Sequence, residues 1–406
     1  MSGPAAAPAI ALLENPIQEY AWGSRTAIAE LLGRSSPAPR PQAEMWMGAH
    51  PRAPSRVRLD GRRVSLIEWI ASNPDEVLGA PVCERFAGRL PFLFKVLAVE
   101  RPLSIQAHPD ARQAREGFAR EEAQGIARDA PERCYRDGSH KPELICALTP
   151  FRTLRGFRSR AEIRALLDAL DAPSLAPERA YLAGPGEHAL RDFLAGLLTM
   201  DSERRARVIE EVAAAATAGA AEQPAFADVL RLLEKRPGDL GSLAPLFLNA
   251  VRLEPGQAMF LPAGELHCYL GGVGVELMAN SDNVLRGGLT GKHVDVPELL
   301  RILTFRETRV EVLSLEGGAG GEAYYQTPAE EFRLSRFDVA PGAPFASGSD
   351  RSVDLLLCTA GDVRIASEVK AQPLVLAKGA SCIVPACAGS YQVEGEGTLY
   401  RASVPG

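Results

Sequence analysis

The feature that most constrains the fold of this 406-residue chain is a block of helical sequence between two stretches of strand-like sequence. From Ser159 to about Lys235 apolar residues recur at helical spacing, and Ser159 with Glu162 forms a capping-box pattern at the start. Short apolar runs broken by Gly and Pro, which are typical of strands, fill residues 16–150 and return at Arg252. We therefore expect the helices to be an insertion into one β domain.

The composition argues against several classes of protein. The net charge is -6, and no basic block with interleaved aromatic residues is present, so we expect no nucleic-acid partner. No apolar run approaches the roughly 18 residues that would span a bilayer, and the N-terminus lacks the basic region of a signal peptide. The seven cysteines are scattered and never spaced CxxC, which indicates reduced thiols. We expect a cytoplasmic, monomeric protein that does not bind membranes.

Four polar residues in three separate stretches could bind one metal ion. Gln106 and His108 lie in PLSIQAHPD, Glu143 lies in SHKPELICAL, and His267 lies in FLPAGELHCYLG. Gln106 and His108 are two residues apart, so on a strand their side chains share a face. Each residue alone is more simply a hydrogen-bonded structural group or a solvated one. Together they predict a divalent-metal site that retains a charge of about +1 and open positions for water or substrate.

A second dense stretch of charge follows His267, in residues 273–300. Arg286 and Lys292 lie there among glycines, and such a pair suits a phosphate or a developing oxyanion. The alternative is a solvated charged loop, which composition alone would favour. The position directly after a candidate metal ligand favours the binding role.

The spacing around His267 resembles a signature motif of the cupins, which are small jelly-roll β-barrels. The pattern Gly-x5-Pro-x-Gly-x2-His begins at Gly256 and ends at His267. The same spacing counted from Gly379 reaches Pro385 at the proline and Ser390 at the histidine. The C-terminal region therefore resembles a second cupin that has lost its ligand.

These patterns predict a mainly β fold with an α-helical insertion, made of two cupin domains and one helical domain. Residues 1–150 and 245–308 are expected to form a discontinuous metal-binding cupin. Residues 151–244 are expected to form the helical insertion, and residues 309–406 the degenerate cupin. One short helix is expected within the first part, at residues 24–32.

Over essentially its whole length the chain resembles the type I phosphomannose isomerases. The strings that carry the resemblance, in the order of the family, are PIQEYAWGSRTAIAELLG, AEMWMGAHPRAPS, PLSIQAHPD, HKPELICAL and LPAGELHCYLGGVGVELMANSDNVLRGGLTGKHVDV. The resemblance implies a zinc-dependent aldose-ketose isomerase that interconverts mannose 6-phosphate and fructose 6-phosphate through a cis-enediol. It also implies one Zn²⁺ per chain and a place in mannose catabolism or GDP-mannose synthesis.

The resemblance also implies roles for individual residues. The implied zinc ligands are Gln106, His108, Glu143 and His267. The implied catalytic and substrate-binding residues are Arg286, Lys141, Glu276, Asp282, Ser104 and Lys292. Among the candidates for the general base we prefer Glu276, with Lys141 and Asp282 as alternatives, because a carboxylate suits proton transfer next to a carbonyl.

Two positions depart from the family pattern. Gly291 stands where proline is usual, which should loosen the backbone before Lys292, and Ala111 stands where lysine is usual.

A metal-binding cupin that binds or senses a sugar phosphate without turning it over is the alternative function. Loss of Arg286 or Lys141 would favour that alternative, and both residues are present. An iron-dependent cupin oxygenase is a further alternative, and Gln106 counts against it because such sites use more histidines.

Overall fold

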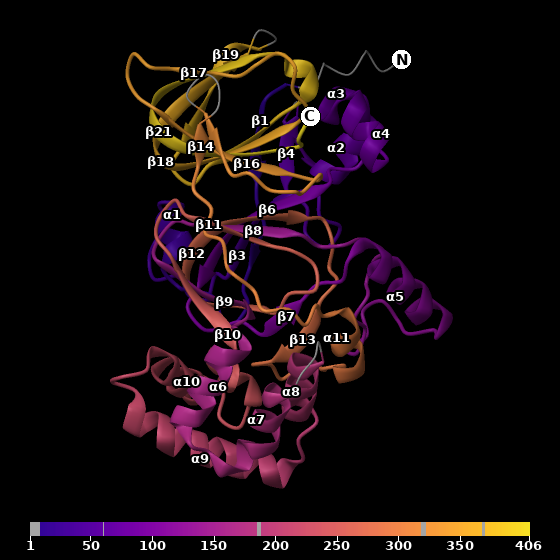
Figure 1. Cartoon of the computed structure of the whole chain (residues 1–406). Coiled ribbons are helices and arrows are strands. Elements are labelled where there is room, and N and C mark those ends of the chain that lie inside the picture. Colours follow the sequence, from indigo (N-terminus) through magenta and orange to yellow (C-terminus); the bar gives the residue numbers. More distant parts are fainter. Residues whose placement is uncertain (1–8, 60, 185–187, 318–321, 368–369) are drawn as a thin grey trace.

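The computed structural model describes residues 9–59, 61–184, 188–317, 322–367 and 370–406. Three parts follow one another along the molecule: a C-terminal β part, a central β part and a helical part (Figure 1). The predicted class, mainly β with a helical insertion, is confirmed. In the described part of the chain no helix is both long enough and apolar enough to cross a membrane.

The central part is an antiparallel sheet of ten described strands. Its strands are β2 (Ile17–Gln18), β3 (Glu44–Gly48), β6 (Phe92–Val99), β7 (Ile105–Ala107), β8 (Glu143–Ala147), β9 (Phe151–Phe157), β10 (Leu248–Leu253), β11 (Ala258–Leu261), β12 (His267–Ala279) and β13 (Leu285–Gly288). Strands from before and after the helices pair directly, as in β8 with β11 and β6 with β12. Strands from the two sides of the helical insertion therefore lie in one sheet.

Strand β12 joins the two sides of this sheet. Its first residues pair with β7 and β9, and its later residues pair with β6 and β8. The register shifts between Tyr269 and Gly271, and Gly272 follows with a φ of 120°. A Cβ at Gly272 would lie 2.7 Å from the carbonyl oxygen of Pro150, so only glycine fits this bend. The bend lets one strand carry His267 and Glu276 on two different parts of the sheet.

The helical part begins where the capping box predicts. Its helices are α6 (Arg160–Leu170), η1 (Pro173–Leu175), α7 (Ala176–Ala183), α8 (Ala189–Leu198), α9 (Ser202–Gly219), α10 (Pro224–Lys235) and η2 (Leu240–Leu246). Both reciprocal bonds between Ser159 and Glu162 are present.

Residues 151–157, which we grouped with the helices, instead form β9. This strand pairs with β10 and β12, and tertiary pairing outweighs its position beside the helical block.

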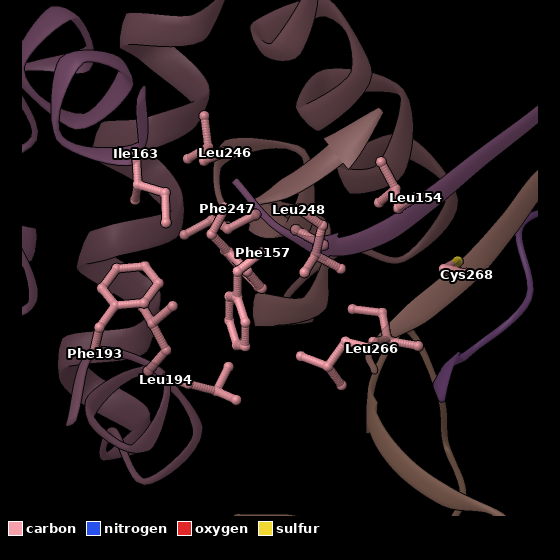
Figure 2. Close-up of a cluster of buried hydrophobic side chains, with 14 of the residues drawn as sticks. Leu154, Phe157, Ile163, Phe193, Leu194, Leu246, Phe247, Leu248, Leu266 and Cys268 are labelled. Atoms are coloured by element: carbon pink, nitrogen blue, oxygen red, sulfur yellow. The ribbon is translucent and has the colours of Figure 1, made fainter. Parts of the chain in front are cut away.

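A shared hydrophobic cluster attaches the helices to the sheet. Figure 2 shows Phe157 of β9 between helical residues such as Phe193 and Leu266, the residue directly before β12. The rings of Phe193 and Phe247 meet edge to face with centroids 5.7 Å apart. The insertion therefore supports, from outside the sheet, the segment that leads into His267.

The N-terminal 150 residues contain more helix than the sequence predicts. The short helix expected at residues 24–32 is present as α1 (Ala27–Leu31). The additional helices are α2 (Leu66–Ser72), α3 (Pro74–Leu78), α4 (Ala80–Phe86) and α5 (Ala111–Ala123). The first three span only five to seven residues each, too few to show a helical period. Helix α5 buries Ala114, Gly117 and Glu121, so it presents no stripe of large apolar side chains.

The C-terminal part is a second antiparallel sheet, of eleven described strands. Its C-terminal strands are β14 (Glu316–Gly317), β15 (Ala323–Tyr324), β16 (Arg333–Val339), β17 (Phe345–Ala346), β18 (Asp354–Ser367), β19 (Lys370–Ala377), β20 (Ser381–Val384) and β21 (Tyr391–Ser403), with η4 (Ala386–Ala388) before β21. Three strands of the N-terminal segment complete it: β1 (Ala11–Glu14), β4 (Arg56–Leu59) and β5 (Arg62–Ser65). Residues that we grouped with the first cupin thus extend the second sheet.

The structure repeats the motif found in the sequence. Gly256 and Gly379 both have positive φ, 85° and 81°, and each lies two residues before a strand of four residues, β11 and β20. Each of these strands is followed directly by a proline. The first copy continues into β12 at His267, whereas the second continues into β21 at Tyr391, after Ser390.

Candidate metal centre

Three of the four predicted ligands converge in the central sheet. His108 follows β7, Glu143 opens β8, and His267 opens β12. Their candidate ligand atoms all lie within 4.8 Å of one another. The Nε2 atoms of His108 and His267 lie 3.4 Å from Oε1 and Oε2 of Glu143 respectively. All three residues are buried, at 4% exposure or less. The carboxylate therefore faces both imidazoles at once.

Backbone carbonyls orient both imidazole rings. Nδ1 of His108 lies 2.8 Å from the carbonyl oxygen of Asn283, and Nδ1 of His267 lies 3.1 Å from that of Glu265. A carbonyl only accepts, so Nδ1 carries the proton and Nε2 presents a lone pair to the carboxylate. Nε2 of His108 is buried and has no hydrogen-bond partner. Lone pairs of two imidazoles and a carboxylate facing one another fit a metal ion between them.

Gln106 lies beside this group on the sheet. Its backbone partner on β12 is His267 and its partner on β13 is Arg286. Directly paired residues project their side chains from the same face, so Gln106 lies between the imidazole and the guanidinium. This placement suits the predicted role of Gln106 as a neutral oxygen ligand.

Lys141 sets the charge of the carboxylate ligand. Its Nζ lies 2.9 Å from Oε1 of Glu143. Burial works against ionisation of Glu143, but the charge of Lys141 helps to outweigh it and hold the pKa of this carboxyl well below its ordinary value. Burial, assisted by Lys141, lowers the pKa of His108 to about 4. At neutral pH the site therefore holds a carboxylate anion and a neutral His108 imidazole, the forms that bind divalent metals.

Glu276 belongs to a buried polar layer of the sheet. It pairs across the strands with Lys95, whose Nζ lies 3.0 Å from Oε2 of Glu276 and 3.5 Å from Oε2 of Glu44. The hydroxyl of Tyr269 donates to Oε1 of Glu276 at 3.0 Å, and the indole of Trp46 donates to Glu44 at 2.5 Å. Burial raises the pKa of Glu276 in spite of Lys95. Sequence reasoning missed Lys95, although a lysine inside the apolar run LPFLFKVLAVE indicates a buried charge with a partner.

Asp282 is held at the edge of the site by two side chains that the sequence did not single out. Its Oδ1 lies 3.0 Å from Nη1 of Arg52, and its Oδ2 lies 3.5 Å from Nε2 of His50. Burial lowers the pKa of His50 to about 4, so this imidazole is neutral at neutral pH. Asp282 is partly exposed, unlike the buried Glu276.

Positive charge gathers next to the metal ligands. Arg286 on β13 is partly buried and Lys292 in the following loop is exposed. Burial lowers the pKa of Lys292, and the charges of Arg286, Arg136 and Arg52 lower it further. Arg136 was missed because no motif distinguishes it from other loop arginines. Ser104, the remaining predicted residue, lies one position before β7 and is partly exposed.

The two departures from the family pattern lie in a loop and at the start of a helix. Gly291 is exposed, and a Cβ added there would meet no atom within 4 Å. Ala111 is the first residue of α5, directly after its N-cap Asp110. Packing therefore does not require glycine at position 291.

Known proteins resemble this chain over nearly its whole length. Residues 10–160 match the catalytic domain of type I phosphomannose isomerase, and residues 322–404 match the cupin domain of mannose-6-phosphate isomerase, which confirms the second predicted cupin. Mannose-6-phosphate isomerase from Salmonella typhimurium is 41% identical over 96% of this chain and 98% of the relative. The human enzyme is 36% identical over 92% of this chain and 93% of the relative.

Solved structures agree with this result. A zinc-bound mannose 6-phosphate isomerase superposes with a TM-score of 0.91 at 39% identity, covering 98% of this chain and 100% of the other. The Salmonella typhimurium enzyme bound to its substrate fructose 6-phosphate and zinc superposes equally well, with a TM-score of 0.91, 39% identity and the same coverage of both chains. From the identity, the coverage and the superposition, the chain belongs to the type I phosphomannose isomerase family.

Proposed function

We propose that this chain is a zinc-dependent mannose-6-phosphate isomerase, which interconverts mannose 6-phosphate and fructose 6-phosphate through a cis-enediol. The observation that carries the proposal is the buried group of His108, Glu143 and His267, in which the lone pairs of both imidazoles face one carboxylate. Gln106 would be the fourth ligand, and each chain would hold one zinc ion. When bound, zinc would supply a Lewis acid for the sugar oxygens next to the reacting carbons.

Glu276 is our proposed general base. In the open-chain aldose the base takes the proton from C2 and returns it to C1, while the O2 hydroxyl proton moves to O1, so that all atoms balance. Burial raises the pKa of Glu276, which brings this carboxyl closer to the pH at which it must both accept and donate a proton. Lys95 and Tyr269 hold its two oxygens in place. Asp282 and Lys141 are the competing candidates.

The cations beside the ligands are the proposed anion-binding groups. Arg286 lies next to Gln106 across the strands, so its guanidinium suits the negative charge that develops on the enediol oxygens. Lys292 and Ser104 are proposed contacts of the substrate, with Lys292 suited to its phosphate. Arg136 and Arg52 add positive charge at the same place and would raise the local concentration of an anionic substrate.

Family resemblance and strand topology support proposals for the domain boundaries, the compartment, the oligomeric state and the pathway of the protein. We propose a discontinuous zinc cupin in residues 1–150 and 245–308, a helical insertion in residues 151–244 and a second cupin in residues 309–406, with β1, β4, β5 and β9 as the exceptions described above. We also propose a cytoplasmic monomer that supplies mannose catabolism or GDP-mannose synthesis.

An isomerase assay with and without a chelator tests the function. The purified protein is expected to convert mannose 6-phosphate into fructose 6-phosphate and to lose this activity when the chelator removes the metal. Glucose 6-phosphate is run in parallel as a competing sugar phosphate. Zinc binding without turnover of either sugar phosphate would instead support the metal-binding cupin that binds or senses its ligand.

A further inference from the structure

We propose that Asn283 and Asp137 are positioning residues that fix two loops around the metal centre, and with them the separation between the metal ligands and the catalytic side chains. One loop, residues 136–140, leads into Lys141 and β8. The other, residues 280–284, leads into β13. The inference rests on the proposed isomerase function and adds residues to it that no sequence motif indicated.

Asn283 uses its whole amide group to hold the neighbouring loop. Its Oδ1 accepts from the backbone N–H groups of Arg136 at 2.7 Å and Asp137 at 3.2 Å. Its Nδ2 donates to the carbonyl oxygens of Asp137 at 2.7 Å and Ser139 at 2.8 Å. An amide side chain has two donors and two acceptor lone pairs, so this set saturates it. Asn283 is fully buried.

The same residue holds a metal ligand. The backbone oxygen of Asn283 is the atom 2.8 Å from Nδ1 of His108. Movement of the backbone at Asn283 would therefore rotate the His108 imidazole or break its orienting bond. Groups that orient a ligating histidine in this way contribute to metal affinity and activity.

Asp137 makes the complementary connection. Its Oδ1 accepts from the Ser281 hydroxyl at 2.9 Å and from the N–H of Ser139 at 3.0 Å. Its Oδ2 accepts from the N–H of Asp282 at 2.9 Å. Bonds to an ionised carboxylate are the stronger kind. Asp137 thereby fixes the backbone of Asp282, whose own carboxylate contacts Arg52.

The strand ladders do not provide this connection in the described residues, because β8 pairs with β11 and β12 whereas β13 pairs with β7. Backbone bonds tie the outer ends of the two loops, from Ala279 N–H to the Pro142 oxygen and from Val284 N–H to the Cys134 oxygen. Between these ends the side chains of Asn283 and Asp137 supply contacts, and the Ser281 hydroxyl adds one to the carbonyl oxygen of Ser139 at 3.2 Å.

The test compares variants with a matched control elsewhere in the chain. Asn249 also bonds to four backbone groups, in its case the carbonyl oxygens of Arg155, Gly156, Phe157 and Thr308, but it lies on β10 and is hydrogen-bonded to no proposed metal ligand in the described structure. Asn283→Ala is expected to weaken zinc binding, measured by chelator competition, by about 10- to 100-fold, and to lower kcat. Asn249→Ala is expected to lower the melting temperature while zinc affinity and kcat stay near wild type.

Asp137→Asn separates the contact to Asp282, which Asp137 makes, from the contact to His108, which Asn283 makes. Its amide can still accept from Ser281 and Ser139 but presents a donor to the Asp282 N–H. We expect kcat to fall at least 10-fold while zinc affinity stays within about 3-fold of wild type, because the bond lost belongs to Asp282 and not to His108. This variant also keeps the proposal testable if Asn283→Ala does not fold.

The zinc measurement needs no turnover, so it separates failure of this inference from failure of the proposed function. An inactive wild type with zinc affinity lost in Asn283→Ala would overturn the isomerase function and support the positioning role. An active wild type, with Asn283→Ala no worse than Asn249→Ala in zinc affinity and kcat and with Asp137→Asn unchanged, would overturn the positioning role.

Discussion

The ammonium group of Lys141 lies 2.9 Å from the carboxylate of Glu143, two residues further along the chain. This contact joins a proposed catalytic residue to a proposed metal ligand. It also means that the charge of Lys141 influences how strongly the ligand carboxylate holds a proton.

The first prediction concerns the pH dependence of metal binding in Lys141→Met. Lys141 lowers the pKa of both Glu143 and His108, so its removal raises both and protonates the two ligands at higher pH. Because protonated ligands do not bind zinc, the acid limb of zinc binding should move to higher pH. Chelator competition across a pH series measures the shift. Lys292→Met is the control. An identical shift in both variants would show that the contact of Lys141 with Glu143 does not set the pH dependence of zinc binding.

The second prediction separates the candidate bases. Glu276→Gln should lower kcat by roughly 10²- to 10⁴-fold while zinc remains bound, because the amide cannot accept the carbon-bound proton. Asp282→Asn should cost less, since Asp282 is partly exposed and held by Arg52. Steady-state kinetics with zinc content measured on the same samples decide the matter. A larger loss in Asp282→Asn than in Glu276→Gln would transfer the role to Asp282.

The third prediction is a stability difference at Lys95. This buried lysine compensates Glu276 and Glu44, so Lys95→Met should lower the free energy of unfolding by about 3–5 kcal/mol. Denaturant unfolding measures the loss. Arg112→Met removes an exposed pair with Glu116 and should change stability little, so equal effects of the two variants would refute the buried network.

The proposed metal ligands could be singled out from the sequence because the signals are local. Gln106 and His108 share a strand face by their spacing, and His267 closes a motif that begins at Gly256. The Lys95–Glu276 pair could not be predicted in this way, because its partners are 181 residues apart and meet only through the pairing of β6 with β12. The pairing of β1 with β20 likewise depends on contact between opposite ends of the chain.

The fourth prediction concerns the departure at Gly291. The position is exposed and open, so Gly291→Ala should raise the free energy of unfolding by about 0.4–1 kcal/mol, because the unfolded chain loses more freedom than the folded one. A stiffer loop before Lys292 should also lower KM for mannose 6-phosphate. Thermal unfolding and steady-state kinetics test the two parts. A lower melting temperature would show that the loop needs a conformation reserved for glycine.

Metal dependence of isomerisation tests the central claim most directly. Protein stripped with a chelator and dialysed should lose conversion of mannose 6-phosphate, and one equivalent of Zn²⁺ per chain should restore it. In His108→Ala and His267→Ala the same addition should restore little activity, because each variant lacks an imidazole of the site. Full turnover by the metal-free protein, or full restoration in both histidine variants, would contradict the account.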